Sequence, residues 1–201
     1  MWLTDGQGTR WEGAVSGVRR GALDVEIGEV VLIERAAPRL VAVQALAKGG
    51  RDEVAVEAMT EIGVDEVIGW SASRSVAKWT DRTAAKWQST ADTAARQARR
   101  EWWPTVTGPA TTADVVARIR TAEVAIVLHE WAATSLSEIE LSGVGEVLVV
   151  IGPEGGIDPE EELVSFCSAG AHSIKLGAEV LRSSTAGVAA LSAICGRTRW
   201  S

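Results

Sequence analysis

The feature that most constrains the fold of this chain is a repeated alternation of apolar strands and helical segments, which begins near Leu40. Residues 40–46 form a continuous apolar run with one Gln, which is typical of a buried parallel strand. A helical pattern follows and ends at Gly63, a residue type that often terminates helices. The alternation predicts an α/β fold with a mostly parallel sheet covered on both faces. The expected strands are 40–46, 64–70, 124–128, 146–151 and 173–176, and the expected helices are 52–62, 81–100, 114–120, 158–168 and 184–197.

The first 38 residues have a different character, because glycines interrupt short alternating runs. Residues 23–27 alternate apolar and polar side chains, and residues 30–33 form a second apolar run, so both are expected to be strands. They predict a small antiparallel β unit of three strands that Pro38 closes. We therefore expect two domains, a small one over 1–38 and a larger α/β domain over 39–201.

Composition excludes several classes of protein. Apolar residues make up 46% and charged residues 23% of the 201 residues, so the chain can bury a core. With 27 acidic and 20 basic residues, the net charge of −7 argues against a general polyanion-coating protein. Two cysteines, Cys167 and Cys195, and two histidines are too few for a disulfide framework or a metal centre; both cysteines are expected to be buried on apolar helix faces. We expect no metal, no membrane segment, no leader and a cytoplasmic location.

A glycine-rich loop over 151–156 leaves an expected strand and enters an expected helix, the place where open α/β sheets bind ligands. It differs from a phosphate loop because Pro153 lacks an N–H and the helix start is already capped by Asp158, with Pro159 next and Glu161 completing a capping box. We infer a ligand that is not anionic, which disfavours a flavodoxin-like nucleotide or flavin binder. The competing interpretation is an ordinary glycine-rich turn.

Three C-terminal segments carry a family resemblance. Residues 152–156 (Gly-Pro-Glu-Gly-Gly), Leu176-Gly177 and residues 180–186 (Val-Leu-Arg-Ser-Ser-Thr-Ala) resemble the ribosomal RNA small subunit methyltransferase E family, uridine-N3 methyltransferases of the knotted SPOUT superfamily. Residues 128–130 (Leu-His-Glu) look like the family's third ligand-binding segment, and the resemblance covers about 40–200. The chain departs from the family at Ser184, where Glu is usual, and at Arg96, where Glu is frequent.

The resemblance implies a trefoil-knotted α/β domain that binds S-adenosylmethionine among three loops and forms a two-fold homodimer. It also implies that residues 1–38 are part of a PUA-like β-barrel, shorter than the family's complete barrel. The loop and the acidic helix start are compatible with this cofactor, because S-adenosylmethionine has no phosphate and carries a positive sulfonium. The implied cofactor-binding residues are Leu128, His129, Glu130, Ile151, Gly152, Pro153, Glu154, Gly155, Gly156, Leu176, Gly177, Leu181 and Ser183.

Arg182 is the expected catalytic residue. The motif implies that it holds the uracil or stabilises charge on its oxygens as N3 loses a proton; the competing role is helix capping or a surface salt bridge. His129 is a general base by residue type, but we expect a structural side chain whose backbone contacts the ligand. The sequence identifies no general base.

The stretch 74–100 holds seven basic and two acidic side chains, a net charge of +5, interleaved with tryptophans. Basic and aromatic side chains together suit RNA, whereas the competing interpretation is a solvated helix face, with Trp79 and Trp87 in the core. With the resemblance, we expect 16S rRNA of the small ribosomal subunit as the partner, and a non-catalytic knotted RNA-binding protein is the alternative. The expected RNA-binding residues are Lys48, Arg51, Arg74, Arg99 and Arg100.

Overall fold

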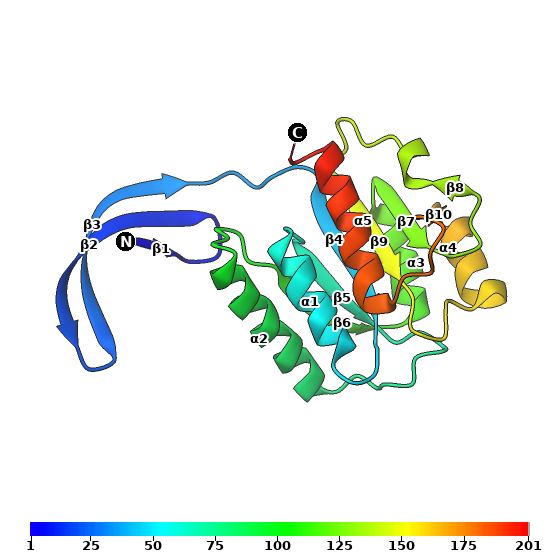
Figure 1. Ribbon diagram of the computed structural model, residues 1–201, viewed down its shortest axis with the longest axis horizontal. Helices are drawn as coiled ribbons and strands as arrows, with labels where there is room; N and C mark the ends of the chain where they lie inside the picture. The colour runs from blue at the N-terminus through cyan, green and yellow to red at the C-terminus, as the bar shows by residue number, and fades with distance from the viewer. Residues whose placement is uncertain (201) are drawn as a thin grey trace.

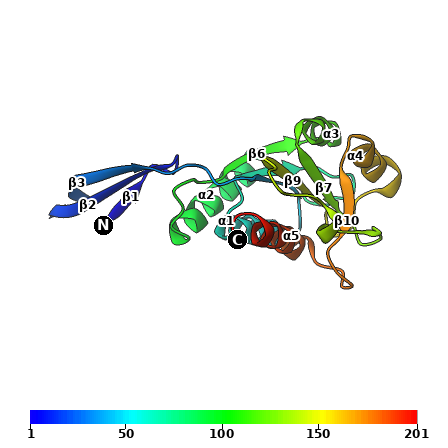
Figure 2. The ribbon, with the colours of Figure 1, turned by 90° about the horizontal axis from the view of Figure 1, so that it is seen from above.

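The computed structural model describes residues 1–200, which form one small antiparallel sheet and one large parallel sheet (Figure 1). The small sheet has the order β1-β2-β3, with β1 at Trp2–Thr4, β2 at Thr9–Arg19 and β3 at Ala22–Leu32. The two strands expected over 23–27 and 30–33 are one continuous strand with a bulge at Gly28: Glu29 pairs with Glu12 and Ile27 pairs with Gly13, so Gly28 has no ladder partner but the strand continues through it. This sheet projects away from the rest of the chain (Figure 2).

The large sheet has seven strands in the order β6-β5-β4-β9-β7-β10-β8, and every pairing is parallel. The expected strands are confirmed, with the most buried pair, β4 and β9, at the centre. The two edge strands were not predicted from the sequence. Strand β6 contains Gly108-Pro109, a pair that is typical of a turn but is tolerated in an edge strand, and β8 has only two residues. The bounds are β4 Arg39–Ala45, β5 Glu66–Trp70, β6 Thr105–Ala110, β7 Val124–Leu128, β8 Thr134–Ser135, β9 Glu146–Ile151 and β10 His172–Lys175.

Helices cover both faces of this sheet, as the alternation predicts (Figure 2). One face carries α1 (Arg51–Glu61), α2 (Asp81–Gln97) and α5 (Ser183–Arg197), and the other carries α3 (Thr112–Thr121) and α4 (Val164–Ser168). Helix α2 ends three residues earlier than expected, because Arg99 adopts a left-handed conformation with φ of 52°. A short 3-10 helix, η1 (Leu136–Glu138), follows β8.

The acidic helix after the glycine-rich loop begins as a π-helix, η2 (Pro159–Leu163), and continues as α4. Asp158 caps it as expected, accepting the N–H groups of Glu160 and Glu161 at 3.0 Å each. The carboxylate that returns a bond to the Asp158 N–H belongs to Glu162, not to Glu161, because the wider π turn brings the fourth residue after the cap into reach. The Glu161 N–H bond, with the Glu160 N–H and the Arg74 guanidinium, lowers the pKa of Asp158, so the helix start stays negatively charged.

Two expectations about single side chains have different outcomes. Trp87 is fully buried and meets the half-buried Trp79 edge to face at 5.1 Å, which confirms both as core residues. Cys195 is buried, but the expectation for Cys167 is wrong: it is exposed, because Phe166 takes the buried position on the short helix α4. Among residues 1–200, no helix is long and apolar enough to cross a membrane.

Candidate ligand-binding site

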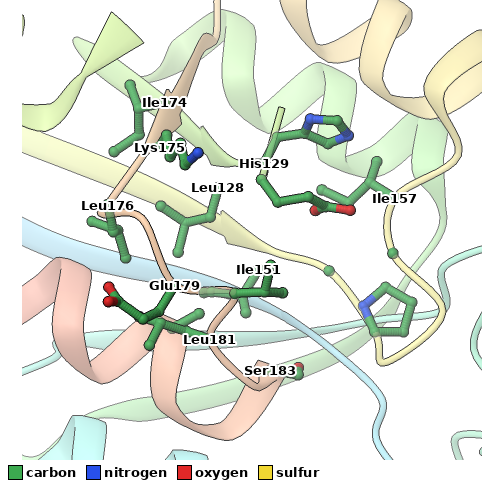
Figure 3. Close-up of a pocket in the computed structure, with 16 residues that line it drawn as sticks. Leu128, His129, Ile151, Ile157, Ile174, Lys175, Leu176, Glu179, Leu181 and Ser183 are labelled. Carbon is green, nitrogen blue, oxygen red and sulfur yellow. The ribbon is translucent and has the colours of Figure 1, made fainter. Parts of the chain in front are cut away.

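A hollow lies where β7, β9 and β10 end and α5 begins, outside the carboxyl ends of parallel strands. Its volume is about 600 Å³, including the part open to solvent. Figure 3 shows aliphatic side chains from Leu128, Ile151, Leu176 and Leu181 around one space, with the carboxylate of Glu179 beside them. The site therefore combines aliphatic side chains with the polar or charged side chains of His129, Glu130, Lys175, Glu179 and Ser183.

The structure brings together most of the predicted cofactor-binding residues, although they come from segments up to 55 positions apart, from Leu128 to Ser183. Glu154, Gly155 and Gly177 do not line the hollow. Six further residues line the hollow and were not predicted from the sequence, although each lies within the motif segments or at most two positions from one of them. They are Ile157, Ile174, Lys175, Glu179, Val180 and Ala186.

Glu154 and Gly155 hold the glycine-rich loop in place through contacts outside the hollow. The Glu154 carboxylate accepts the N–H of Lys48 at 3.1 Å, which ties the loop to the segment after β4. Arg74 forms an ion pair with Asp158 at 2.9 Å and donates to the Gly155 carbonyl at 3.4 Å. On the inner side of the loop, a Cβ at Gly152 would lie 2.7 Å from Cγ1 of the buried Ile157, so the loop requires glycine there.

Gln44, a fully buried residue on β4, supports the start of α5 and was not found from the sequence. Its amide NH₂ donates to the Ala45 carbonyl at 3.0 Å and to Oγ of Ser183 at 2.9 Å. A carbonyl can only accept, which fixes the NH₂ on that side and makes Ser183 Oγ an acceptor toward Gln44. The Ser183 hydroxyl hydrogen is therefore free to donate toward the hollow that the residue lines.

Arg182 immediately precedes α5 and lies between two lining residues, but it does not itself line the hollow. Its side chain is exposed and makes neither of the competing structural contacts within residues 1–200: it forms no ion pair, and the helix start has no side-chain cap. His129 donates its backbone N–H to Ile174 at 3.0 Å, while its ring Nδ1 accepts the Trp131 N–H at 3.4 Å. The imidazole thus has a local backbone partner.

The five predicted RNA-binding residues do not share one environment. Lys48, Arg51 and Arg99 are exposed, whereas Arg74 is engaged with Asp158. Arg100 is a correction: its side chain is 12% exposed and donates to the Thr60 and Val64 carbonyls at 2.9 and 2.7 Å.

Arg100 is structural because the turn after α2 directs it inward, beside Asp65 at 3.8 Å, where it satisfies carbonyls at the end of α1. Burial lowers the pKa of its guanidinium, an effect that the neighbouring Asp65 opposes. The basic residues around Arg100 in the sequence do not indicate this structural role, because the carbonyls to which it donates lie about 40 residues earlier in the chain. In the described part of the chain, no cluster of His, Cys, Asp and Glu is arranged to hold a metal ion.

A parallel α/β sheet with a hollow at the ends of its strands defines a class of ligand-binding α/β protein. Comparison with known protein families shows which member of this class the chain resembles: residues 34–195 match the RNA methyltransferase domain. The ribosomal RNA small subunit methyltransferase E of Mycobacterium tuberculosis (strain CDC 1551 / Oshkosh) is 38% identical over 98% of this chain and 79% of its own length. That of Bacillus subtilis (strain 168) is 30% identical over 76% of this chain and 64% of its own length. This chain belongs to the ribosomal RNA small subunit methyltransferase E family.

Solved structures share the fold. A Legionella pneumophila protein in complex with the cofactor SAM has a TM-score of 0.84 at 25% identity, covering 98% of this chain and 82% of its own. The ribosomal RNA small subunit methyltransferase E of Neisseria gonorrhoeae, bound to S-adenosyl methionine, has a TM-score of 0.88 at 21% identity, covering 98% of this chain and 83% of its own. The parallel α/β architecture predicted from the sequence is that of these proteins.

Proposed function

We propose that this chain transfers a methyl group from S-adenosylmethionine to N3 of a uridine in 16S rRNA of the small ribosomal subunit. The observation that carries the proposal is the convergence of residues 128–130, 151–156 and 176–183 on one hollow. These are the segments in which the sequence resembles the family. The names of the relatives and the cofactor bound in the neighbouring structures support the same activity.

The residues of the hollow suit this cofactor. S-adenosylmethionine has a flat purine ring, whose faces the aliphatic side chains of Leu128, Ile151 and Leu176 can cover. It carries a cationic sulfonium and an ammonium, which the carboxylate of Glu179 favours, and a carboxylate, for which Lys175 is a partner. The negatively charged helix start after the loop would oppose a phosphate but not this ligand. When bound, the cofactor supplies an electrophilic methyl group.

We assign the catalytic role to Arg182. Uracil N3 must lose its proton before it can accept a methyl group, and negative charge then spreads to O2 and O4. A guanidinium next to the lining residues Leu181 and Ser183 can hold those oxygens and stabilise that charge as it develops. The absence of an ion pair within residues 1–200 leaves its donors available for substrate.

We propose that Lys48, Arg51, Arg74 and Arg99 contribute to RNA binding, with Arg74 exchanging part of its ion pair with Asp158 for phosphate. We also propose that residues 1–38 belong to a PUA-like barrel and that 39–201 form a SPOUT domain with a trefoil knot. The separate antiparallel sheet and the order of the C-terminal motifs support this division.

We predict a homodimer that buries the outer side of α5. The inner side of this helix packs on the sheet through Gly187, Leu191 and Ile194, but Ala193 and Gly196 remain exposed on the side that faces away from it. Small residues allow a second helix to approach closely. Sedimentation equilibrium at micromolar concentration should therefore report twice the mass of the chain, and Ala193→Glu should shift it to the monomer. A monomer for the unmodified chain would rule the dimer out.

The test of the proposed function is the chemistry of the product. Nucleosides from 16S rRNA of a strain that lacks this chain should have lost N3-methyluridine by mass spectrometry, and expression of the chain should restore it. Restoration by the chain but not by an Arg182→Ala variant would separate the enzyme from a non-catalytic RNA-binding protein. A complete N3-methyluridine signal in the deletion strain would contradict the proposal.

A further inference from the structure

A second hollow lies where the small sheet meets the C-terminal end of α2, and it belongs to no motif of the family resemblance. Its volume is about 1190 Å³, including the part open to solvent. In Figure 1 the small sheet and the C-terminal end of α2 lie on the left, whereas β7 and β10, at whose ends the first hollow lies, are on the right. Its lining residues are Trp2, Leu3, Thr4, Arg10, Arg96, Arg99, Arg100 and Glu101.

The walls of this hollow are held together by backbone bonds between distant segments. The Gly8 N–H donates to the Glu101 carbonyl and the Trp103 N–H donates to the Gly6 carbonyl, both at 2.9 Å. The indole N–H of Trp102 donates to the Ile33 carbonyl at 2.9 Å. These bonds fix the segment after α2 against the small sheet, so the arginines of the helix end and the side chains of β1 and β2 face one preformed space.

Some charged side chains of the second hollow have partners within the protein and others do not. Arg100 is committed to the carbonyls of Thr60 and Val64, and Glu101 is paired with Arg10 at 3.2 Å. Arg96 and Arg99 therefore remain as cations with no carboxylate partner within residues 1–200: Arg96 lies over the Trp103 ring at 4.8 Å, and Arg99 is exposed. In a chain with a net charge of −7, this is a local site for an anion.

An aromatic surface lies beside these cations. The Trp2 side chain is 57% exposed, and the Arg10 guanidinium stacks on its ring at 3.7 Å, which holds the indole in place. The exposed indole offers a flat π face on which a planar group can stack. The site thus offers a stacking platform and unpaired guanidinium groups together, the two elements by which proteins hold single-stranded nucleic acid.

We propose that this second hollow binds a nucleotide of a single-stranded segment of the RNA substrate, with its base against Trp2 and its phosphates at Arg96 and Arg99. The inference rests on the proposed function, because it assigns to the same substrate an anchoring site remote from the methyl-transfer hollow. An acidic peptide would satisfy the arginines but would leave the indole without a flat partner. The charge and the aromatic surface together favour RNA.

The test measures binding of a fluorescein-labelled single-stranded RNA oligonucleotide by anisotropy, with a double-stranded RNA and a polyglutamate peptide as competitors. Arg99→Asn removes a charge without new backbone strain, because asparagine tolerates the left-handed conformation at this position. The matched control is Arg82→Asn, the same change on an exposed residue at the other end of α2. Trp2→Ala removes the platform, and Trp2→Phe retains an aromatic face.

We expect Trp2→Ala to weaken binding about five-fold or more, with recovery in Trp2→Phe, as for other stacked bases. Arg99→Asn should weaken binding and reduce the slope of log K against log salt by about 0.7, while Arg82→Asn leaves both unchanged. Only single-stranded RNA should compete. Equal losses for Arg99→Asn and Arg82→Asn, full affinity in Trp2→Ala, or stronger competition by polyglutamate would each overturn the inference.

The outcome is distinguishable from a failure of the proposed function itself. If the unmodified chain forms N3-methyluridine in 16S rRNA while Trp2→Ala and Arg99→Asn bind RNA normally, the second site and the RNA-binding role of Arg99 are wrong, and the proposed methyl transfer stands. Affinity for S-adenosylmethionine provides the folding control, because it should be unchanged in all of these variants.

Discussion

Replacing Arg182 with alanine should lower kcat for methyl transfer by about 10²–10³-fold, the usual loss when one preorganised donor to a developing anion is removed. The residue adjoins two lining residues of the first hollow and makes no ion pair within residues 1–200, so its guanidinium is available to the uracil oxygens. An interaction made mainly in the transition state affects kcat more than cofactor binding. The measurement is steady-state methyl transfer to rRNA beside calorimetric titration with S-adenosylmethionine, whose Kd should stay within about two-fold.

Arg120→Ala is the matched control for this prediction. Arg120 is also an exposed arginine, but it lies on α3, on the opposite face of the large sheet. Its replacement should leave kcat unchanged. If Arg182→Ala weakened cofactor binding as strongly as it slowed transfer, the residue would belong to cofactor binding or folding rather than to catalysis.

Replacing Asp65 with alanine should lower the free energy of unfolding by about 3–5 kcal/mol, as expected when one partner of a buried ion network is lost. The Asp65 side chain is 3% exposed, bonds Arg199 directly and accepts the Leu40 N–H at 2.8 Å, with Arg100 and Arg35 at 3.8 and 3.9 Å. Without the carboxylate, the largely buried guanidinium groups of Arg100 and Arg199 repel each other, and the Leu40 N–H loses its acceptor.

Urea denaturation followed by circular dichroism measures this change. Glu57→Ala is the control, because Glu57 is an exposed carboxylate on α1 and its loss should alter the free energy of unfolding by no more than about 0.5 kcal/mol. A small effect of Asp65→Ala, similar to that of the control, would mean that the network contributes little net stability.

The parts of the fold that could be predicted are those with strong local patterns. The apolar runs at β4 and β9 and the terminating Gly63 fix strands and a helix end within a few residues. The first hollow was predictable because its lining comes from three short motifs at strand ends, where the topology of a parallel sheet brings them together. In these regions the local sequence pattern and the overall fold favour the same structure.

The parts that could not be predicted depend on contacts between distant segments. Arg100 looks like its neighbour Arg99, yet one is buried against carbonyls of α1 and the other is exposed, because the backbone turns sharply between them and α2. In the sequence, Gln44 is a polar residue within an apolar strand. Its role is visible only in the structure, where Ser183, 139 positions later in the chain, lies beside it. Neither pairing leaves a local signal.

Calorimetric titration of Gly152→Ala beside Gly28→Ala tests whether the hollow at the ends of β7, β9 and β10 holds S-adenosylmethionine. Both variants add one methyl group: at Gly152 it would lie 2.7 Å from Ile157 Cγ1 in the wall of the hollow, whereas at Gly28, in the small sheet, it would lie in ordinary contact 3.6 Å from the Glu12 carbonyl oxygen. We expect the unmodified chain and Gly28→Ala to bind one S-adenosylmethionine per chain with equal affinity, and Gly152→Ala to bind at least about ten-fold more weakly, a loss of about 1.4 kcal/mol. No binding by the unmodified chain, or equal affinity in all three proteins, would contradict it.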